Sequence, residues 1–142
     1  RSFSDGRSSS KVSIHSKELV DLLAKYSIVQ NKSEAVRVPD AIPGNLVSHF
    51  LRGYFDGDGT ISFTKGGQLY FSVVSASYAI MKDFQREFSA LSGNRIIDYR
   101  TYYKLTVTGN KKALSLFNLI YEGSDESNRL ERKYKTYLTK KV

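Results

Sequence analysis

The sequence predicts an α+β domain in which amphipathic helices cover one face of a twisted antiparallel sheet. Two kinds of segment support this fold class: helical ones with apolar residues three and four positions apart, and strand-like ones with strict alternation. Short turn-like stretches separate consecutive alternating segments, as in antiparallel hairpins. With 142 residues, 40% of them hydrophobic, the chain is long enough to bury one sizeable core.

The first well-marked helix is predicted to begin at Pro43, because proline's missing N–H costs nothing at the first helical position. Gly53 lies inside this helix, where a glycine costs roughly 1 kcal/mol relative to alanine. We therefore interpret Gly53, together with Leu51, as the place where a second helix packs closely. The apolar face of the helix is formed by Leu46, Val47, Phe50, Leu51, Tyr54 and Phe55.

Two pairs of strands are expected after this helix. In the first pair, Ile61 and Phe63 face one side while Ser62 and Thr64 face the other. A turn at 65–68 leads into a second strand that continues both faces. The further elements expected are a helix over 78–91 that ends at Gly93, strands over 95–100 and 102–108, a helix after Gly109-Asn110, and a basic terminal helix over 128–141.

The N-terminal third resembles a later part of the chain. An alternating segment at 12–16 precedes a helical segment, as the segment at 71–75 precedes the helix that contains Phe84. The same order of strand, serine cap and amphipathic helix indicates part of an internal repeat. We therefore predict that residues 1–38 end a preceding unit and that residues 39–142 form a complete one.

Composition restricts the class of protein. The net charge of +8 and the pI of about 9.6 indicate a polyanionic partner such as nucleic acid. The sequence has no cysteine, which excludes disulfides and cysteine zinc sites. It has no apolar run long enough to span a membrane, so no membrane partner is expected. An intracellular protein of the cytoplasm or nucleoid, or of an organelle, fits these observations.

Two aspartates interleaved with glycines end the first helix, in the segment Leu51–Gly59. Carboxylate and carbonyl oxygens gathered at such a turn are ligands for hard divalent cations. An EF-hand loop is excluded because Tyr54 and Lys65 would take its first and last ligand positions. A solvated Asp-Gly turn is the plainest alternative, and the packed helix before the turn argues against it.

Leu51–Gly59 resembles the signature of the LAGLIDADG homing endonucleases, with Arg52 in place of a small residue. The resemblance implies an αββαββα unit whose sheet forms a DNA-binding saddle. It implies that Asp58 and the main-chain carbonyl of Gly57 hold Mg²⁺, with Mn²⁺ as a substitute. It also implies that Asp56 caps or supports the site. The identical positions are Leu51, Gly53, Asp56, Asp58 and Gly59.

The strands present one polar face that suits nucleic acid. Such side chains contact base edges and phosphates when a β-ribbon lies in the major groove of duplex DNA. The alternative is the ordinary solvated face of a half-covered antiparallel sheet. The motif and the positive charge favour DNA. The residues predicted to contact DNA are Ser62, Thr64, Lys65, Gln68, Tyr70, Ser72, Arg100, Tyr102, Lys104 and Arg132.

The resemblance also implies a basic residue near each metal site that polarises the attacking water or stabilises developing charge. Lys104 lies on the polar strand face, and Lys133 lies in a segment that resembles the end of many family units. We predict that both act catalytically beside Asp58. The alternative is that both contact only phosphate or solvent.

The function implied is that of a site-specific, homing-type endonuclease of duplex DNA, carried by an intron, an intein or a phage mobile element. Double-strand cleavage needs a second acidic motif, from a homodimer partner or from a missing N-terminal half. The alternative is a non-cleaving DNA- or RNA-binding protein of the same fold, such as a transcription regulator or an intron maturase. The presence of both Asp56 and Asp58 favours the enzyme.

Overall fold

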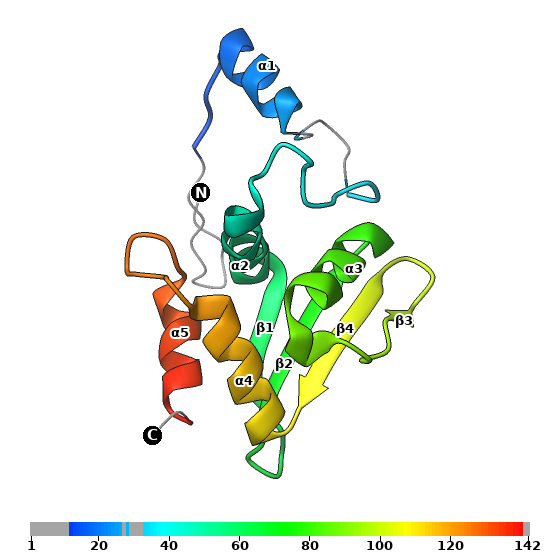
Figure 1. The fold of residues 1–142 in the computed structure, drawn as a ribbon, viewed down its shortest axis with the longest axis vertical. Helices are drawn as coiled ribbons and strands as arrows, with labels where there is room; N and C mark the ends of the chain where they lie inside the picture. Colours follow the sequence, from blue (N-terminus) through cyan, green and yellow to red (C-terminus); the bar gives the residue numbers. More distant parts are fainter. Residues whose placement is uncertain (1–11, 27, 29–32, 141–142) are drawn as a thin grey trace, which may run out of the picture.

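The computed structural model describes residues 12–26, 28 and 33–140. These residues form five α-helices, four strands and two short 3₁₀ turns, η1 and η2 (Figure 1). The elements are α1 (Lys17–Lys25), η1 (Gly44–Leu46), α2 (Val47–Asp58), β1 (Gly59–Phe63), β2 (Leu69–Ser75), α3 (Tyr78–Glu87), η2 (Ser89–Leu91), β3 (Ile97–Asp98), β4 (Tyr103–Thr108), α4 (Asn110–Tyr121) and α5 (Glu131–Leu138).

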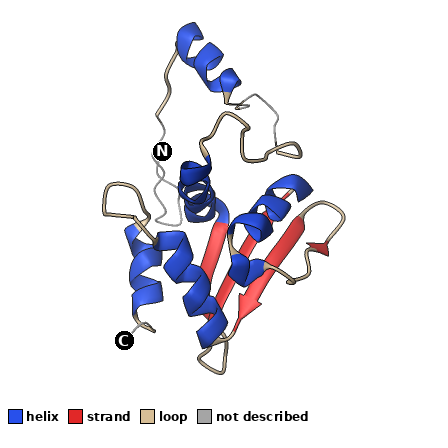
Figure 2. Ribbon diagram, in the orientation of Figure 1, coloured by secondary structure: helices blue, strands red, loops and turns tan. Residues whose placement is uncertain are grey.

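The strands form one antiparallel sheet in the order β1-β2-β4-β3, which confirms the predicted α+β class. Helices α2, α3 and α4 cover one face of this sheet, and α5 lies beside α4 near β1 (Figures 1 and 2). Among the described residues, no helix is both long and apolar enough to cross a membrane.

The core lies between the sheet and these helices. Phe55 of α2 stacks on Phe71 of β2, with ring centroids 5.0 Å apart, and Phe117 of α4 packs against both rings. Alternation along the strands supplies the apolar side: the cross-strand neighbours Ile61, Phe71 and Val107 share one face of the sheet. Leu51, predicted to pack against a helix, is fully buried in this core.

The strand predicted at 12–16 is wrong. These residues are extended but pair with no strand in the described structure, so their alternation lacks the partner that a sheet requires. The helix predicted after them is confirmed as α1, whose Ser16 cap accepts a hydrogen bond from the Leu19 N–H at 3.2 Å. None of the residues of α1 is buried.

Several boundaries differ from the prediction for local reasons. Pro43 precedes the 3₁₀ turn η1, and the α-helix itself begins at Val47. The terminal helix begins at Glu131 and not at 128, because Asn128 is held in the preceding loop by Arg52 and Asp125. Strand β3 has only two residues, Ile97–Asp98, where 95–100 was expected.

Candidate functional site

The candidate site lies where α2 ends at Asp58 and β1 begins at Gly59, with no loop between them. The chain turns directly against Phe55: a Cβ at Gly59 would lie 2.1 Å from the Phe55 ring. Glycine is required there because of this close approach. The backbone at Asp58 is therefore held at the junction of a helix and a strand, and the Asp58 side chain is exposed.

Asp58 opens into a hollow at the edge of the sheet. The hollow is lined by Ser33, Val36, Tyr54, Asp58, Val74, Ser75, Ala76 and Tyr102. The Tyr54 hydroxyl donates to Ser75 Oγ at 2.8 Å, and burial, together with the Asp58 charge, raises the pKa of Tyr54 against the opposing effect of this hydrogen bond. The Asp58 carboxylate makes no hydrogen bond or ion pair within the described residues, so its oxygens are available to a ligand.

Lys133 closes the C-terminal end of α2. Its side chain is only 3% exposed, and its ammonium donates to the carbonyls of Phe55, Asp56 and Gly59 at 2.7, 2.9 and 2.5 Å. Three N–H donors therefore meet three carbonyl oxygens, and the Gly57 carbonyl is not among them. Burial lowers the pKa of Lys133, while the Asp56 and Asp58 carboxylates oppose this shift.

This geometry bears on the role predicted for Lys133. The side chain lies at the motif, as the sequence indicated. The alternative prediction was that it contacts phosphate or solvent, but its ammonium contacts main-chain carbonyls. Helix ends leave carbonyls without partners, and a buried cation there both satisfies them and complements the helix dipole. Lys133 thus holds the turn that carries Asp58. Its participation in catalysis stays a prediction.

Both carboxylate oxygens of Asp56 have protein partners. Oδ1 accepts from the Tyr121 hydroxyl at 3.0 Å, and Oδ2 accepts from the Leu130 N–H at 2.7 Å. Leu130 is the N-cap residue of α5, so Asp56 links α2 to α4 and to the start of α5. Burial, reinforced by Asp56, raises the pKa of Tyr121. Both Asp56 oxygens are thus occupied by protein donors, and the supporting role of Asp56 stays a prediction.

Arg52 is a structural residue that sequence reasoning missed. It is 3% exposed and donates to the carbonyl and the side-chain oxygen of Asn128, at 3.2 and 3.1 Å. Its Nη1 has no partner within the described residues, and burial lowers the pKa of the guanidinium. The position of Arg52 next to Leu51 in the motif helix could have indicated this role, because a cation beside the apolar face of a helix needs a hydrogen-bond or charge partner when it is buried.

The predicted DNA-contacting residues fall on one sheet face and its turns, apart from Arg132 on α5. Ser62 pairs with Tyr70, and Lys104 pairs with Val74, so these side chains lie on the face opposite the core. Ser72 shares that face. The remaining predicted residues are Thr64, Lys65 and Gln68 at the β1–β2 turn, and Arg100 and Tyr102 at the β3–β4 turn.

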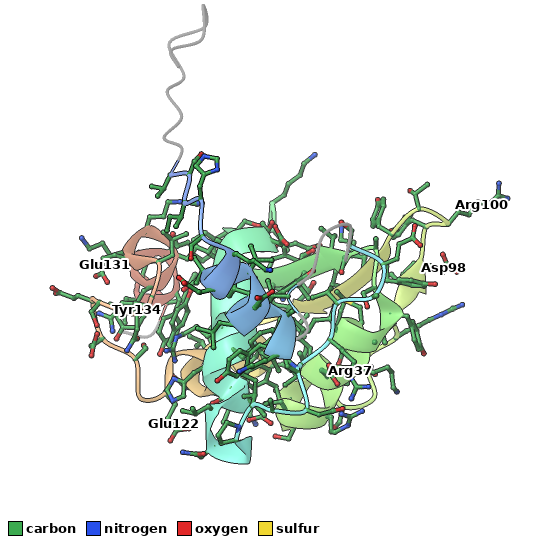
Figure 3. All side chains as sticks on the ribbon, turned by 90° about the horizontal axis from the view of Figure 1, so that it is seen from above. Arg37, Asp98, Arg100, Glu122, Glu131 and Tyr134 are labelled. Carbon is green, nitrogen blue, oxygen red and sulfur yellow. The ribbon has the colours of Figure 1, made fainter. Side chains whose placement is uncertain are left out.

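Figure 3 shows which side chains lie at the two edges of the molecule. Arg100 and Asp98 project at one edge of the molecule, while Glu131 and Tyr134 of α5 lie at the opposite edge. Val74 and Tyr102 also line the Asp58 hollow, so the hollow adjoins the sheet face beside the β3–β4 turn.

Comparison with known proteins places this fold among described ones. The model of the family described as "LAGLIDADG-like domain" matches residues 45–121. A probable translation initiation factor IF-2 of Thermococcus kodakarensis is 34% identical over 119 residues, which are 80% of this chain and 10% of that protein.

A solved structure agrees in fold with this chain. The group I intron-encoded homing endonuclease I-CeuI, complexed with DNA, aligns with a TM-score of 0.54 at 16% identity, over 88% of this chain and 61% of its own. The meganuclease I-SmaMI, bound to DNA, aligns with a TM-score of 0.48 at 21% identity, over 89% of this chain and 49% of its own. The chain thus spans about three fifths of I-CeuI and a tenth of the initiation factor.

Proposed function

The chain belongs to the family of LAGLIDADG-like domains, and from that premise we propose that it is a metal-dependent endonuclease acting on duplex DNA. The observation that carries the proposal is the exposed Asp58 carboxylate at the end of the motif helix, which has no partner among the described residues and lies in a hollow continuous with the polar sheet face. The reaction proposed is hydrolysis of a phosphodiester bond.

Charge and surface chemistry support duplex DNA as the substrate. The chain carries a net charge of +8, and its uncovered sheet face bears hydroxyls, a lysine and tyrosine rings. The structure of similar fold, the homing endonuclease I-CeuI, contains bound DNA. We propose that Ser62, Tyr70 and Lys104 lie against the DNA, with Lys104 at a phosphate close to the Asp58 hollow. Ser72 lies on the same face but is only 6% exposed, so it offers little surface to DNA.

The donor set at Asp58 fits a magnesium-type ion. No three histidine or carboxylate side chains gather into a metal cluster in the described residues, so the protein offers one carboxylate and the Gly57 carbonyl that Lys133 leaves unused. Mg²⁺ is commonly bound by one or two carboxylates, with water and phosphate oxygens completing the shell. When bound, such a cation supplies activation of a water nucleophile and neutralises charge on the phosphate.

The chain's own residues then have separate tasks. Asp58 holds the cation, and Lys133 fixes the helix end on both sides of it through the carbonyls of Asp56 and Gly59. Asp56 keeps α5, and with it Lys133, docked on α2. We propose that Lys133 acts mainly by positioning the Asp58 turn, because its three donors are occupied.

A second acidic motif is proposed to complete the double-strand site. A Cβ added at Gly53 or Gly57 would have nothing within 4 Å, so the close helix predicted from Gly53 is not supplied by the described chain. We propose that the motif helix of a second unit packs on this exposed side of α2. Residues 1–38 are proposed to end a preceding unit, since α1 buries no residue of its own.

The share of the initiation factor that this chain matches bears on the genetic context of the gene. The sequence likeness to the initiation factor covers only a tenth of that protein. A domain inserted into an unrelated host protein gives this pattern, so we propose an intein-type mobile element ahead of the intron and phage alternatives.

The binding half of the proposal predicts a steep salt dependence. Affinity for a duplex pool should fall by roughly 10³-fold between 50 and 200 mM salt, the fall expected for about six phosphate contacts. Lys104→Ala should weaken binding and lower the salt slope by about one. Lys111→Ala, which removes an exposed charge from α4, is the matched control. Fluorescence anisotropy across the titration measures both quantities, and a flat titration contradicts DNA binding.

Gly53→Leu should separate folding from association. The added side chain meets open space in this chain and replaces a helical glycine, which costs roughly 1 kcal/mol relative to alanine, so the melting temperature of the isolated chain should rise by about 3 °C. Association with a second motif unit should be lost, since the leucine would occupy the approach of its helix. Sedimentation of the chain alone and with the preceding unit measures this. Unimpaired association would contradict the proposed helix contact.

Binding without scission is the alternative function. A regulator or maturase of the same fold would show the salt-dependent affinity and would not nick supercoiled plasmid in Mg²⁺ or Mn²⁺. The proposed enzyme, with a single motif, should nick one strand slowly. The plasmid assay therefore distinguishes the two functions.

A further inference from the structure

The β3–β4 turn has an unusual backbone. Arg100 has φ of 71°, and it is the one non-glycine residue with positive φ in the described part of the chain. This region is disfavoured for residues with a Cβ and is freely adopted by glycine. A glycine would therefore adopt this turn at a lower conformational free energy. The arginine at this position is thus better explained by a function than by folding.

The turn is built firmly around that conformation. The Asp98 Oδ1 accepts from the Arg100 N–H at 2.6 Å, and the Tyr99 N–H donates to the Tyr102 carbonyl at 2.9 Å. A further bond runs from the Thr101 N–H to the Tyr99 carbonyl at 2.9 Å. The consequence is that the Arg100 side chain projects outward at the edge of the molecule (Figure 3).

Two tyrosines flank the arginine and stack on each other. The rings of Tyr99 and Tyr102 lie 4.9 Å apart at 13°, although the residues are 46% and 39% exposed. Val74 and Ile97, both 37% exposed, lie on the same sheet face on either side of Lys104. An apolar, aromatic area thus interrupts the polar face where Tyr102 and Val74 border the Asp58 hollow.

We propose that the turn 99–102 is a base-stacking contact of the DNA-binding surface, with Arg100 bound to the adjoining phosphate. This inference rests on the proposed function. The ligand that it assigns to the turn is a nucleobase that is unstacked from its neighbours beside the cleavage site. Every base has a π-face that can stack on an exposed aromatic ring, so such stacking does not depend on the DNA sequence. The pair Tyr99–Tyr102 is already ordered, so little side-chain freedom is lost on contact.

The aromatic contact predicts a preference for unstacked bases. The wild-type chain should bind a duplex with one mismatched base roughly tenfold more tightly than the paired duplex, because a mismatch lowers the cost of unstacking. Tyr102→Phe should keep this preference, and Tyr102→Leu should lose it. Tyr26→Leu, at the exposed tyrosine that follows α1 as its C-cap, is the matched control. Competition anisotropy with both duplexes measures the ratio.

The strained arginine predicts opposite effects on stability and binding. Arg100→Gly should raise the melting temperature by about 3 °C by relieving the positive φ, and Arg100→Ala should not. Both variants should weaken duplex binding and lower the salt slope by about one.

The outcomes separate this inference from the proposed function. Loss of mismatch preference in Tyr102→Leu, with weaker binding by both Arg100 variants, supports the contact. If these variants bind like the wild type while Lys104→Ala is weakened, the turn contact is overturned and DNA binding stands. If wild-type affinity shows no salt dependence, the proposed function itself fails.

Discussion

Asp58→Asn should abolish strand scission while leaving duplex binding intact. The substitution keeps the side chain's size and removes the charge that would hold the cation, and the Asp58 carboxylate has no partner among the described residues whose loss would disturb folding. We expect nicking to fall by about 10²–10³-fold, the effect of removing one group that stabilises developing charge. Binding should persist or tighten slightly, because a carboxylate near phosphates repels them when no cation is bound.

Nicking of supercoiled plasmid in Mg²⁺ and in Mn²⁺, with anisotropy for binding, measures both effects. Asp21→Asn makes the same charge change at an exposed position of α1 and should nick like the wild type. A variant at Asp58 that nicks at the wild-type rate would remove the basis for the site. Complete double-strand cleavage by the monomeric chain would contradict the need for a second motif.

Lys133→Met should have the largest effect on stability. Methionine retains the length and the apolar stem, but the carbonyls of Phe55, Asp56 and Gly59 lose the ammonium donor at a buried helix end, although the Phe55 carbonyl still accepts from the Gly59 N–H. Hydrogen bonds to a charged group contribute about 1.5–3 kcal/mol each to stability. The variant no longer carries the cost of burying the ammonium, and this offsets part of the loss. We expect the free energy of unfolding to fall by about 3 kcal/mol.

Urea unfolding monitored by circular dichroism measures this change. Lys135→Met, at an exposed lysine of the same helix, is the matched control and should stay within about 0.5 kcal/mol of the wild type. An unchanged urea midpoint for Lys133→Met would show that the ammonium does not hold the helix end. Loss of nicking without loss of stability would instead restore the direct catalytic role predicted from the resemblance.

Local patterns predicted those parts of the fold that depend on neighbours in sequence. The alternation of Ile61 with Ser62 decides which face each covers, and the periodicity of α2 decides which side meets the core. The motif itself placed Asp58 at the end of the helix. The strand predicted at 12–16 failed because alternation does not supply a pairing partner.

Contacts between distant residues could not be predicted in this way. Lys133 reaches carbonyls more than seventy positions away, and Arg52 reaches Asn128 over 76 positions. Nothing in the local sequence shows that Arg52 meets a carbonyl there, or that the Lys133 ammonium is buried. Both roles become visible only when α5 is docked on α2.

The central claim is that Asp58, with the Gly57 carbonyl, holds a divalent cation at the DNA. Electron paramagnetic resonance of free Mn²⁺ measures binding directly, by titration into the complex of the chain with a fixed amount of duplex. The account predicts that the Asp58→Asn complex binds about one Mn²⁺ fewer per chain than the wild-type complex, and that Asp21→Asn matches the wild type. Equal Mn²⁺ binding by the wild-type and Asp58→Asn complexes would contradict it.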